Sequence, residues 1–305
     1  MKHLKLHLLL ALTVAAVGCV DMAAMTADEV GRADTAPEGE QTAKRMSFNR
    51  MSFNAMGEYP DLAETIVEES LDSSEAAIEL LHKQNGPELL KYAARCALPE
   101  GDELVVTDND GIDHAFPGSL GLVPDWVHTP PDLDQQRWIV GCLLAHVNAY
   151  GEEVPISLRG RHPELLVETT SPEASKFPYF EGAFFGEFGT ATSTEPGVTQ
   201  MYACYGPDLF VACGGNHAVT AHEFWKRICA RGGCDDFTVV GPCTDFHIPG
   251  QMACSKKADP YGYATCLSQQ SNGGSWPGSA VTYDAGVINV YLSTISCESE
   301  DPDAL

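Results

Sequence analysis

The spacing of hydrophobic side chains predicts helices in the first half of the chain. Leu62, Ile66 and Val67 share one face of a helix that begins near Asp61, because an α-helix has about 3.6 residues per turn. The same spacing, with capping residues at the ends, predicts helices over residues 73–85, 87–96, 129–150 and 220–229. These segments place the helical part of the fold mainly before residue 150.

The helix predicted over residues 129–150 is the best marked of these. Thr129-Pro130-Pro131-Asp132 predicts a capping box with Thr129 as the cap, and Gly151 predicts the end of the helix. Between Trp138 and Val147 apolar side chains point to nearly every side of the helix. A helix that is apolar all round lies in the interior of a protein, so we expect this one to be central.

Strands are predicted mainly in the second half. Residues 104–106 and 114–116 flank Asp108-Asn109-Asp110-Gly111, a turn typical of a β-hairpin. Residues 154–158 and 287–292 predict two more strands. Because helices precede strands without a regular βαβ alternation, the fold class predicted is α+β, with a helical N-terminal half packed on a disulfide-rich, mainly β C-terminal half.

The first residues have the pattern of an export signal, a basic start followed by an apolar run of about ten residues. A membrane-spanning helix needs roughly 20. The run ends at Ala16-Val17-Gly18-Cys19, which resembles the lipobox of bacterial lipoproteins, although Ala16 stands where that family usually has Leu. The resemblance implies that residues 1–18 are removed and that Cys19 carries a lipid. Cleavage after Gly18 by an ordinary signal peptidase, giving a secreted protein, is the alternative.

Residues 19–58 predict a disordered acidic tether, because they offer few large side chains to bury. The tether contains a five-residue repeat, Arg45-Met46-Ser47-Phe48-Asn49 followed by Arg50-Met51-Ser52-Phe53-Asn54. Two copies are too few for a solenoid. We expect the repeat to lie against the domain as an ordered strap, with a recognition or sorting segment as the alternative. Residues 59–298 are expected to form one globular domain and residues 299–305 an acidic tail.

Charge excludes one class of partner. The chain has 18 basic and 43 acidic residues, and removal of residues 1–18 takes away Lys2 and Lys5 but no acid, which leaves a net charge of −27. Nucleic-acid binding needs clustered Lys and Arg. We therefore expect no nucleic-acid partner. The membrane, through the lipid on Cys19, and a protein or glycan at the cell surface are the partners expected.

Ten cysteines follow Cys19 and predict up to five disulfides, since an even number is typical of exported proteins. A bond between Cys96 and Cys142 would join two predicted helices; the remaining connectivity stays open. Zinc knuckles of the Cys-x2-Cys type are absent, and Val106 and Pro117 stand where an EF-hand loop needs acids. We therefore predict neither a metal nor a cofactor. The ten are Cys96, Cys142, Cys204, Cys213, Cys229, Cys234, Cys243, Cys254, Cys266 and Cys297.

Two acidic or histidine clusters are weak candidates for catalysis. Glu181 and Glu187 lie among glycines and aromatic residues, where an apolar wall can keep one carboxyl protonated, as glycoside cleavage requires. In an extended strand they would be about 20 Å apart, beyond the roughly 5 to 9.5 Å of a glycosidase pair. His217 and His222 are five residues apart, whereas two metal ligands on one helix face need a spacing of three or four.

A third cluster suggests binding. Tyr261, Tyr263 and Trp276 stand on glycine-rich segments, and aromatic rings on such loops stack on carbohydrate or peptide ligands. The alternative is that these rings fill a small core beneath disulfide-crossed loops.

Three function classes remain, because the P-loop, the Gly-x-Ser-x-Gly elbow and the Cys-x-x-Cys-His haem motif are all absent. The preferred class is an exported, lipid-anchored envelope protein with a binding role. A secreted hydrolase would bring Glu181 or Glu187 together with His217, His222 or Asp245 in one cleft. A structural envelope component would have no ligand site.

Overall fold

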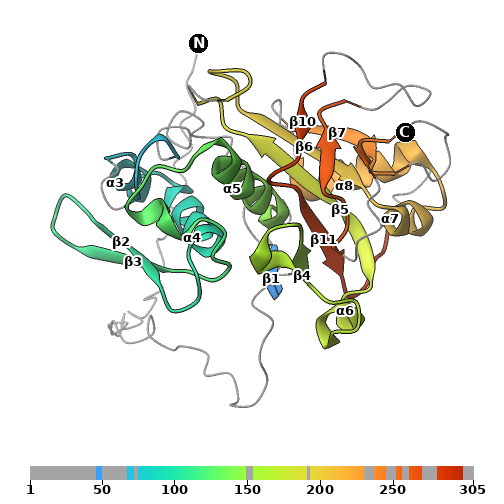
Figure 1. Cartoon of the computed structure of the whole chain (residues 1–305), viewed down its shortest axis with the longest axis horizontal. Coiled ribbons are helices and arrows are strands. Elements are labelled where there is room, and N and C mark those ends of the chain that lie inside the picture. The colour runs from blue at the N-terminus through green and yellow to red at the C-terminus, as the bar shows by residue number, and fades with distance from the viewer. Residues whose placement is uncertain are drawn as a thin grey trace, which may run out of the picture. The chain divides into compact units, whose positions relative to one another are not determined.

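The computed structural model describes residues 46–49, 67–71, 75–148, 154–190, 193–229, 237–244, 252–255, 261–269 and 280–297. All of them belong to one unit, Thr42–Leu305. The predicted fold class is confirmed: helices dominate the N-terminal half and sheet dominates the C-terminal half (Figure 1), and disulfides join cysteines in both. The predicted signal peptide, Cys19, Cys234, Asp245, Trp276 and the acidic tail lie outside the described residues.

A six-stranded sheet forms the centre, and its order is β1-β4-β11-β5-β6-β7. Neighbouring strands are antiparallel except β6 and β7, which are parallel. The last strand in the described part of the chain, β11, therefore lies between β4 and β5 (Figure 1). The strands are β1 (Met46–Asn49), β4 (Val154–Arg159), β5 (Tyr179–Glu187), β6 (Gln200–Tyr205), β7 (Phe237–Pro242) and β11 (Ile288–Leu292).

Both faces of the sheet are covered, which explains the unbroken apolar runs of its central strands. Phe184 and Ala203 point into a core shared with the helices, whereas the neighbouring Phe185 and Cys204 point into a second core rich in aromatic side chains and cysteines. The second core lies against a small sheet of order β10-β9-β8. Its strands are β8 (Cys254–Ser255), β9 (Thr265–Leu267) and β10 (Thr282–Tyr283).

The helical layer is built around α5 (Leu133–His146), which is buried along most of its length and contacts β5, as predicted for a central helix. Its cap differs from the expectation. Asp132, not Thr129, accepts a hydrogen bond from the backbone of Gln135, and the Gln135 side chain accepts one from the backbone N–H of Asp132. The helix ends at His146, earlier than expected, because Val147 is extended.

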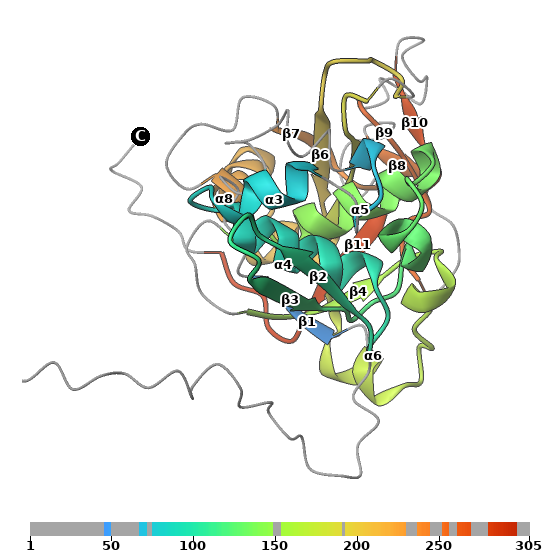
Figure 2. The same ribbon diagram turned by 90° about the vertical axis from the view of Figure 1, so that its left-hand side faces the viewer.

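Two helices and a hairpin complete this layer, and Figure 2 shows all three on the side that faces the viewer. They are α3 (Glu75–Leu81), α4 (Gly86–Ala97) and the hairpin of β2 (Glu103–Thr107) and β3 (Asp113–Pro117). The predicted hairpin is confirmed. In its turn, the Asp108 carboxylate accepts hydrogen bonds from the N–H groups of Asp110 and Ile112 and lies 2.9 Å from Nε2 of His114.

Gly86 begins α4, whereas the sequence predicted residue 87 as the start of this helix and placed residue 86 between the two helices. A Cβ atom at Gly86 would collide with the carbonyl oxygen of Leu80. The two helices pass so close together that only glycine fits. The sequence shows that residue 86 is a glycine but does not show to which of the two helices it belongs.

The chain after β6 forms α7 (Pro207–Ala212) and α8 (His217–Cys229). Helix α8 begins three residues before the predicted Thr220. The side chain of Asn216 accepts hydrogen bonds from the N–H groups of Ala218 and Val219 and so caps the helix. The shorter helical segments are η1 (Pro124–Val127), η2 (Pro163–Leu165) and α6 (Pro172–Lys176). No helix in the described ranges is long and apolar enough to cross a membrane.

The first copy of the five-residue repeat supplies the edge strand of the large sheet. Met46 pairs with Ser157 and Asn49 with Val154, in antiparallel register. This copy therefore lies against the domain, as the strap interpretation expects. The second copy, residues 50–54, lies outside the described residues.

Four disulfides join described cysteines, which confirms the disulfide-rich prediction. Cys96–Cys142 joins α4 to α5, as the positions of the two cysteines suggested. The other three are Cys204–Cys243, Cys213–Cys297 and Cys254–Cys266. Cys229 is also disulfide-bonded.

Candidate functional site

A surface depression of about 480 Å³ is the candidate ligand site. It lies where the start of β5, helix α7 and the segment after β11 meet. Two of its apolar side chains are unusually exposed for their type, Val211 at 72% and Tyr179 at 42%. The residues that line it are Tyr179, Asp208, Val211, Ala212, Ser293, Thr294 and Ile295.

The walls of the depression are fixed to one another by a hydrogen bond and a disulfide. The backbone N–H of Phe180 donates to Oδ2 of Asp208 at 2.7 Å, which joins β5 to α7. Cys213, directly after α7, is bonded to Cys297, two residues after the last lining residue, Ile295. A ligand would therefore meet walls that are already in position, which reduces the conformational entropy lost on binding.

The lining residues combine three kinds of chemistry. Tyr179 offers an aromatic ring, and Val211 and Ile295 offer aliphatic surface. Ser293 and Thr294 offer hydroxyl groups that can donate and accept hydrogen bonds. Asp208 offers Oδ1, which has no hydrogen-bond partner among the residues that the structure describes.

Glu181 lies elsewhere, in a buried ion pair. Its Oε1 is 2.8 Å from Nε of Arg227 on α8, and the guanidinium also donates to the carbonyl oxygen of Ala145. The other carboxylate oxygen, Oε2, has no hydrogen-bond partner within the described ranges. Burial raises the pKa of Glu181, and the positive charge of Arg227 opposes that rise. Glu181 is thus enclosed between sheet and helices rather than facing a cleft.

Glu187 belongs to a different buried ion pair. Its Oε2 accepts from Nε and Nη2 of Arg137 at 2.9 and 2.8 Å, and its Oε1 accepts from the backbone N–H of Thr194. The guanidinium of Arg137 lies 5.2 Å from the ring of Tyr283 in the second core. Each of the two glutamates therefore has its own arginine, and they do not face one another as a catalytic pair.

The two histidines of α8 differ in environment. His217 is half-buried, its Nδ1 lies 2.8 Å from the hydroxyl of Tyr205, and its ring packs on Phe210 at 4.4 Å. Burial raises the pKa of Tyr205 to about 12. His222 is exposed. Neither histidine lines the depression, nor do Glu181 and Glu187.

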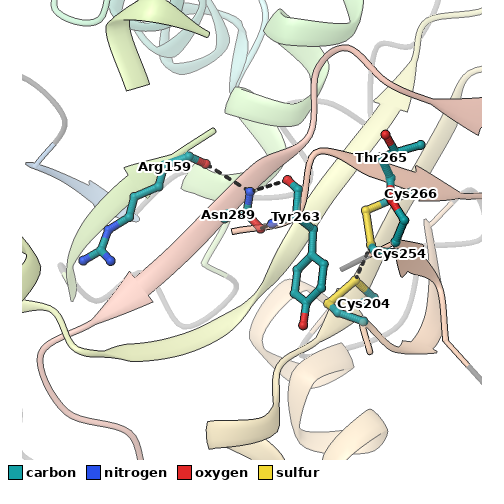
Figure 3. Close-up of a disulfide and its surroundings, with 9 residues drawn as sticks. Arg159, Cys204, Cys254, Tyr263, Thr265, Cys266 and Asn289 are labelled. Carbon is teal, nitrogen blue, oxygen red and sulfur yellow. Dashed lines mark hydrogen bonds between the residues drawn. A yellow bond between two sulfur atoms is a disulfide. The ribbon is translucent and has the colours of Figure 1, made fainter. Parts of the chain in front are cut away.

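Tyr263 is part of the second core, and its ring packs 5.4 Å from that of Phe180. Asn289 of β11 fixes this segment: its Oδ1 accepts from the N–H of Tyr263, and its Nδ2 donates to the carbonyl oxygens of Tyr263 and Arg159 (Figure 3). Tyr261, two residues earlier, is half-buried. The ring of Tyr263 therefore fills the interior and does not present a face to solvent.

Two buried groups of cysteine and histidine side chains bring several ligand atoms close together, but their cysteines are oxidised. Cys96, Cys142 and His146 form one group, and Cys204, Cys254 and Cys266 form the other. Metal ions bind thiolates, and every sulfur in both groups is in a disulfide. In this state neither group offers a thiolate to a metal.

None of the protein-family models, curated proteins or solved structures compared with the chain matches it. Tyr179, Asp208 and Val211 carry no signal in the sequence, because an exposed tyrosine and a buried one have the same place in a strand pattern. Only the packing of three distant segments reveals that these side chains share one hollow.

Proposed function

We propose that this protein is an exported envelope protein, anchored through a lipid on Cys19, that binds a glycan at the cell surface. The anchor is supported by the short apolar leader and by the lipobox-like Ala16-Val17-Gly18-Cys19. Export is supported by the disulfides, which form and persist in oxidising compartments. Because Met46–Asn49 pairs with β4 as an edge strand of the domain, the tether that separates the domain from the membrane would be the acidic segment between Cys19 and β1.

The observation that carries the binding role is the depression around Tyr179. A sugar ring has an apolar face that stacks on an aromatic side chain, and hydroxyl groups that bond to carboxylates and hydroxyls. Tyr179 supplies the ring, while Asp208 and Thr294 supply polar atoms at the same site. The volume of about 480 Å³ lies within the range of small-ligand sites, roughly 300 to 1,000 Å³.

The hydrolase alternative receives no support from the described residues. Acid–base catalysis needs two groups around one reacting bond, whereas Glu181 and Glu187 are enclosed in separate ion pairs with Arg227 and Arg137. The ordered hollow also favours a binding protein over a purely structural component.

Calorimetric titration of the mature domain with purified envelope oligosaccharides tests the proposal. Tyr179→Ala should weaken binding by about two- to tenfold, because ring stacking contributes roughly 0.5 to 1.5 kcal/mol and 1.4 kcal/mol corresponds to one decade of affinity. Val198→Ala is the matched control, since Val198 is also an exposed apolar residue but does not line the depression. Equal binding by the Tyr179 variant and the parent would refute this site.

The anchor is tested separately. Cys19→Ala in the full chain should release the protein from the membrane fraction, because the lipid needs the cysteine thiol. Unchanged fractionation would refute the anchor while leaving the glycan site untouched.

A further inference from the structure

Two disulfides in the second core touch one another. Cys204–Cys243 joins β6 to the end of β7, and Cys254–Cys266 joins β8 to β9. Sγ of Cys204 lies only 3.4 Å from Sγ of Cys254 (Figure 3). Neither sulfur carries a proton, so this is a van der Waals contact between two disulfides and not a hydrogen bond. All four cysteines are fully buried.

The backbone keeps these sulfurs together independently of the disulfides. The N–H of Cys254 donates to the carbonyl oxygen of Cys243, and the N–H of Cys243 donates to that of Tyr205, both at 2.9 Å. Cys254 and Cys266 are directly opposite one another in the small sheet. When one disulfide opens, the hydrogen bonds still hold the released sulfur next to the other disulfide.

We propose that these four cysteines form one thiol–disulfide exchange site, whose substrate is a small thiol, and that Cys204–Cys254 is its alternative bond. This activity is independent of the proposed glycan binding. An external thiolate attacks Sγ of Cys266, forms a mixed disulfide with it and releases the Cys254 thiolate. That thiolate attacks Sγ of Cys204, forms Cys204–Cys254 and releases the Cys243 thiolate. Each step forms one S–S bond and breaks one, so no net oxidation or reduction occurs.

A dithiol reductant gives a balanced second outcome. The Cys243 thiolate takes up a proton, and the second thiol of the reductant attacks the mixed disulfide and frees Cys266. The reductant leaves as its cyclic disulfide, and the protein keeps one bond, Cys204–Cys254, and two thiols. Two electrons pass from the reductant to the four-cysteine site.

When the four cysteines hold only one disulfide, loop length favours Cys204–Cys254 over either of the original bonds. Cys254–Cys266 spans 12 residues and Cys204–Cys243 spans 39, whereas Cys204 and Cys254 are 50 residues apart. A bond that closes a longer loop restricts the unfolded chain more and so stabilises the folded state more. The native hydrogen bonds already place Cys204 and Cys254 in contact, so forming that bond requires little rearrangement.

Entry of the thiol requires local opening, because all four sulfurs are buried. The small sheet that covers them has strands of only two or three residues. Short elements with few hydrogen bonds open at lower free energy than a whole domain. We therefore expect exchange on the timescale of minutes to hours that is typical of uncatalysed disulfide rearrangement. Exchange should be faster at alkaline pH, because the thiolate is the nucleophile.

Two single substitutions test the proposal from opposite sides. Cys243→Ser leaves Cys204 as a thiol, which should attack Cys254 and release Cys266. Cys266→Ser leaves Cys254 as a thiol, which should attack Cys204 and release Cys243. After incubation at pH 8 and alkylation, mass spectrometry of non-reduced peptides should find a Cys204–Cys254 cross-link in both variants, with the label on Cys266 and Cys243 respectively. Label that stays on Cys204 and Cys254 would overturn the proposal.

The unmodified full chain gives a test that does not depend on a variant folding. One equivalent of dithiothreitol should produce alkylated Cys243 and Cys266 in the same molecule, together with the Cys204–Cys254 peptide. Alkylation of native partners only, such as Cys254 with Cys266, would refute exchange. Cys213→Ser is the control, because it leaves Cys297 as a free thiol. Cys297 is outside the sulfur cluster found among the described residues, so the alkyl label in this variant should remain on Cys297.

Discussion

His146 lies fully buried near the end of α5, where its charge state is tied to folding. Nδ1 of its ring is 2.8 Å from the carbonyl oxygen of Cys142, and the ring lies 5.1 Å from that of Tyr92. A carbonyl oxygen only accepts hydrogen bonds, so Nδ1 carries the proton of the neutral ring. Burial lowers the pKa of His146 from 6.5 to about 3. The folded protein therefore keeps this side chain neutral at any pH near neutrality.

The stability consequence follows from proton linkage. Between the two pKa values the unfolded chain binds a proton at this position and the folded chain does not, so stability is lost as the pH falls through that window. With pKa values of 6.5 and about 3, acidification from pH 7 to pH 5 should destabilise the fold by about 2 kcal/mol through His146 alone. This is a large effect for a domain whose total stability is typically about 5 to 15 kcal/mol.

Urea unfolding at pH 7 and pH 5, followed by tryptophan fluorescence with disulfides intact, measures this contribution. His146→Phe keeps a ring beside Tyr92 but cannot bind a proton, so the difference in unfolding free energy between the two pH values should shrink by about 2 kcal/mol relative to the parent. His222→Gln, at an exposed position, serves as the matched control and should leave the difference unchanged. An equal pH difference in His146→Phe and the parent would refute the assignment.

Two further substitutions test the structure. Arg137→Met should destabilise the fold by about 3 to 5 kcal/mol, because it leaves the Glu187 carboxylate buried without its cation. The double variant Arg137→Met with Glu187→Leu should recover most of that loss, because no buried charge remains. A double variant no more stable than Arg137→Met would contradict this explanation. Asp132→Ala should lower the free energy of unfolding by about 0.5 to 2 kcal/mol through loss of the α5 cap, while Thr129→Ala should have little effect. The reverse ranking in thermal unfolding would restore Thr129 as the cap.

Local patterns in the sequence predicted the elements whose stability depends on near neighbours. The all-round apolar surface of residues 138–147 identified the central helix, and the turn at 108–111 identified the hairpin. Helix ends were less accurate. Thr129 and Thr220 both have capping sequences, but Asp132 and Asn216 form the caps, because several residues near a helix start can cap it and packing selects one.

The sequence by itself determined that the fold is α+β, that its best-marked helix is central and that its cysteines form disulfides, because hydrophobic period, capping and cysteine number are read along the chain. Only the tertiary structure decided that β11 lies between β4 and β5, that Cys204 touches Cys254, and that Tyr179 shares a hollow with Val211. These arrangements join residues far apart in sequence. Their free energy comes from packing several segments at once, and no local pattern records which segments meet.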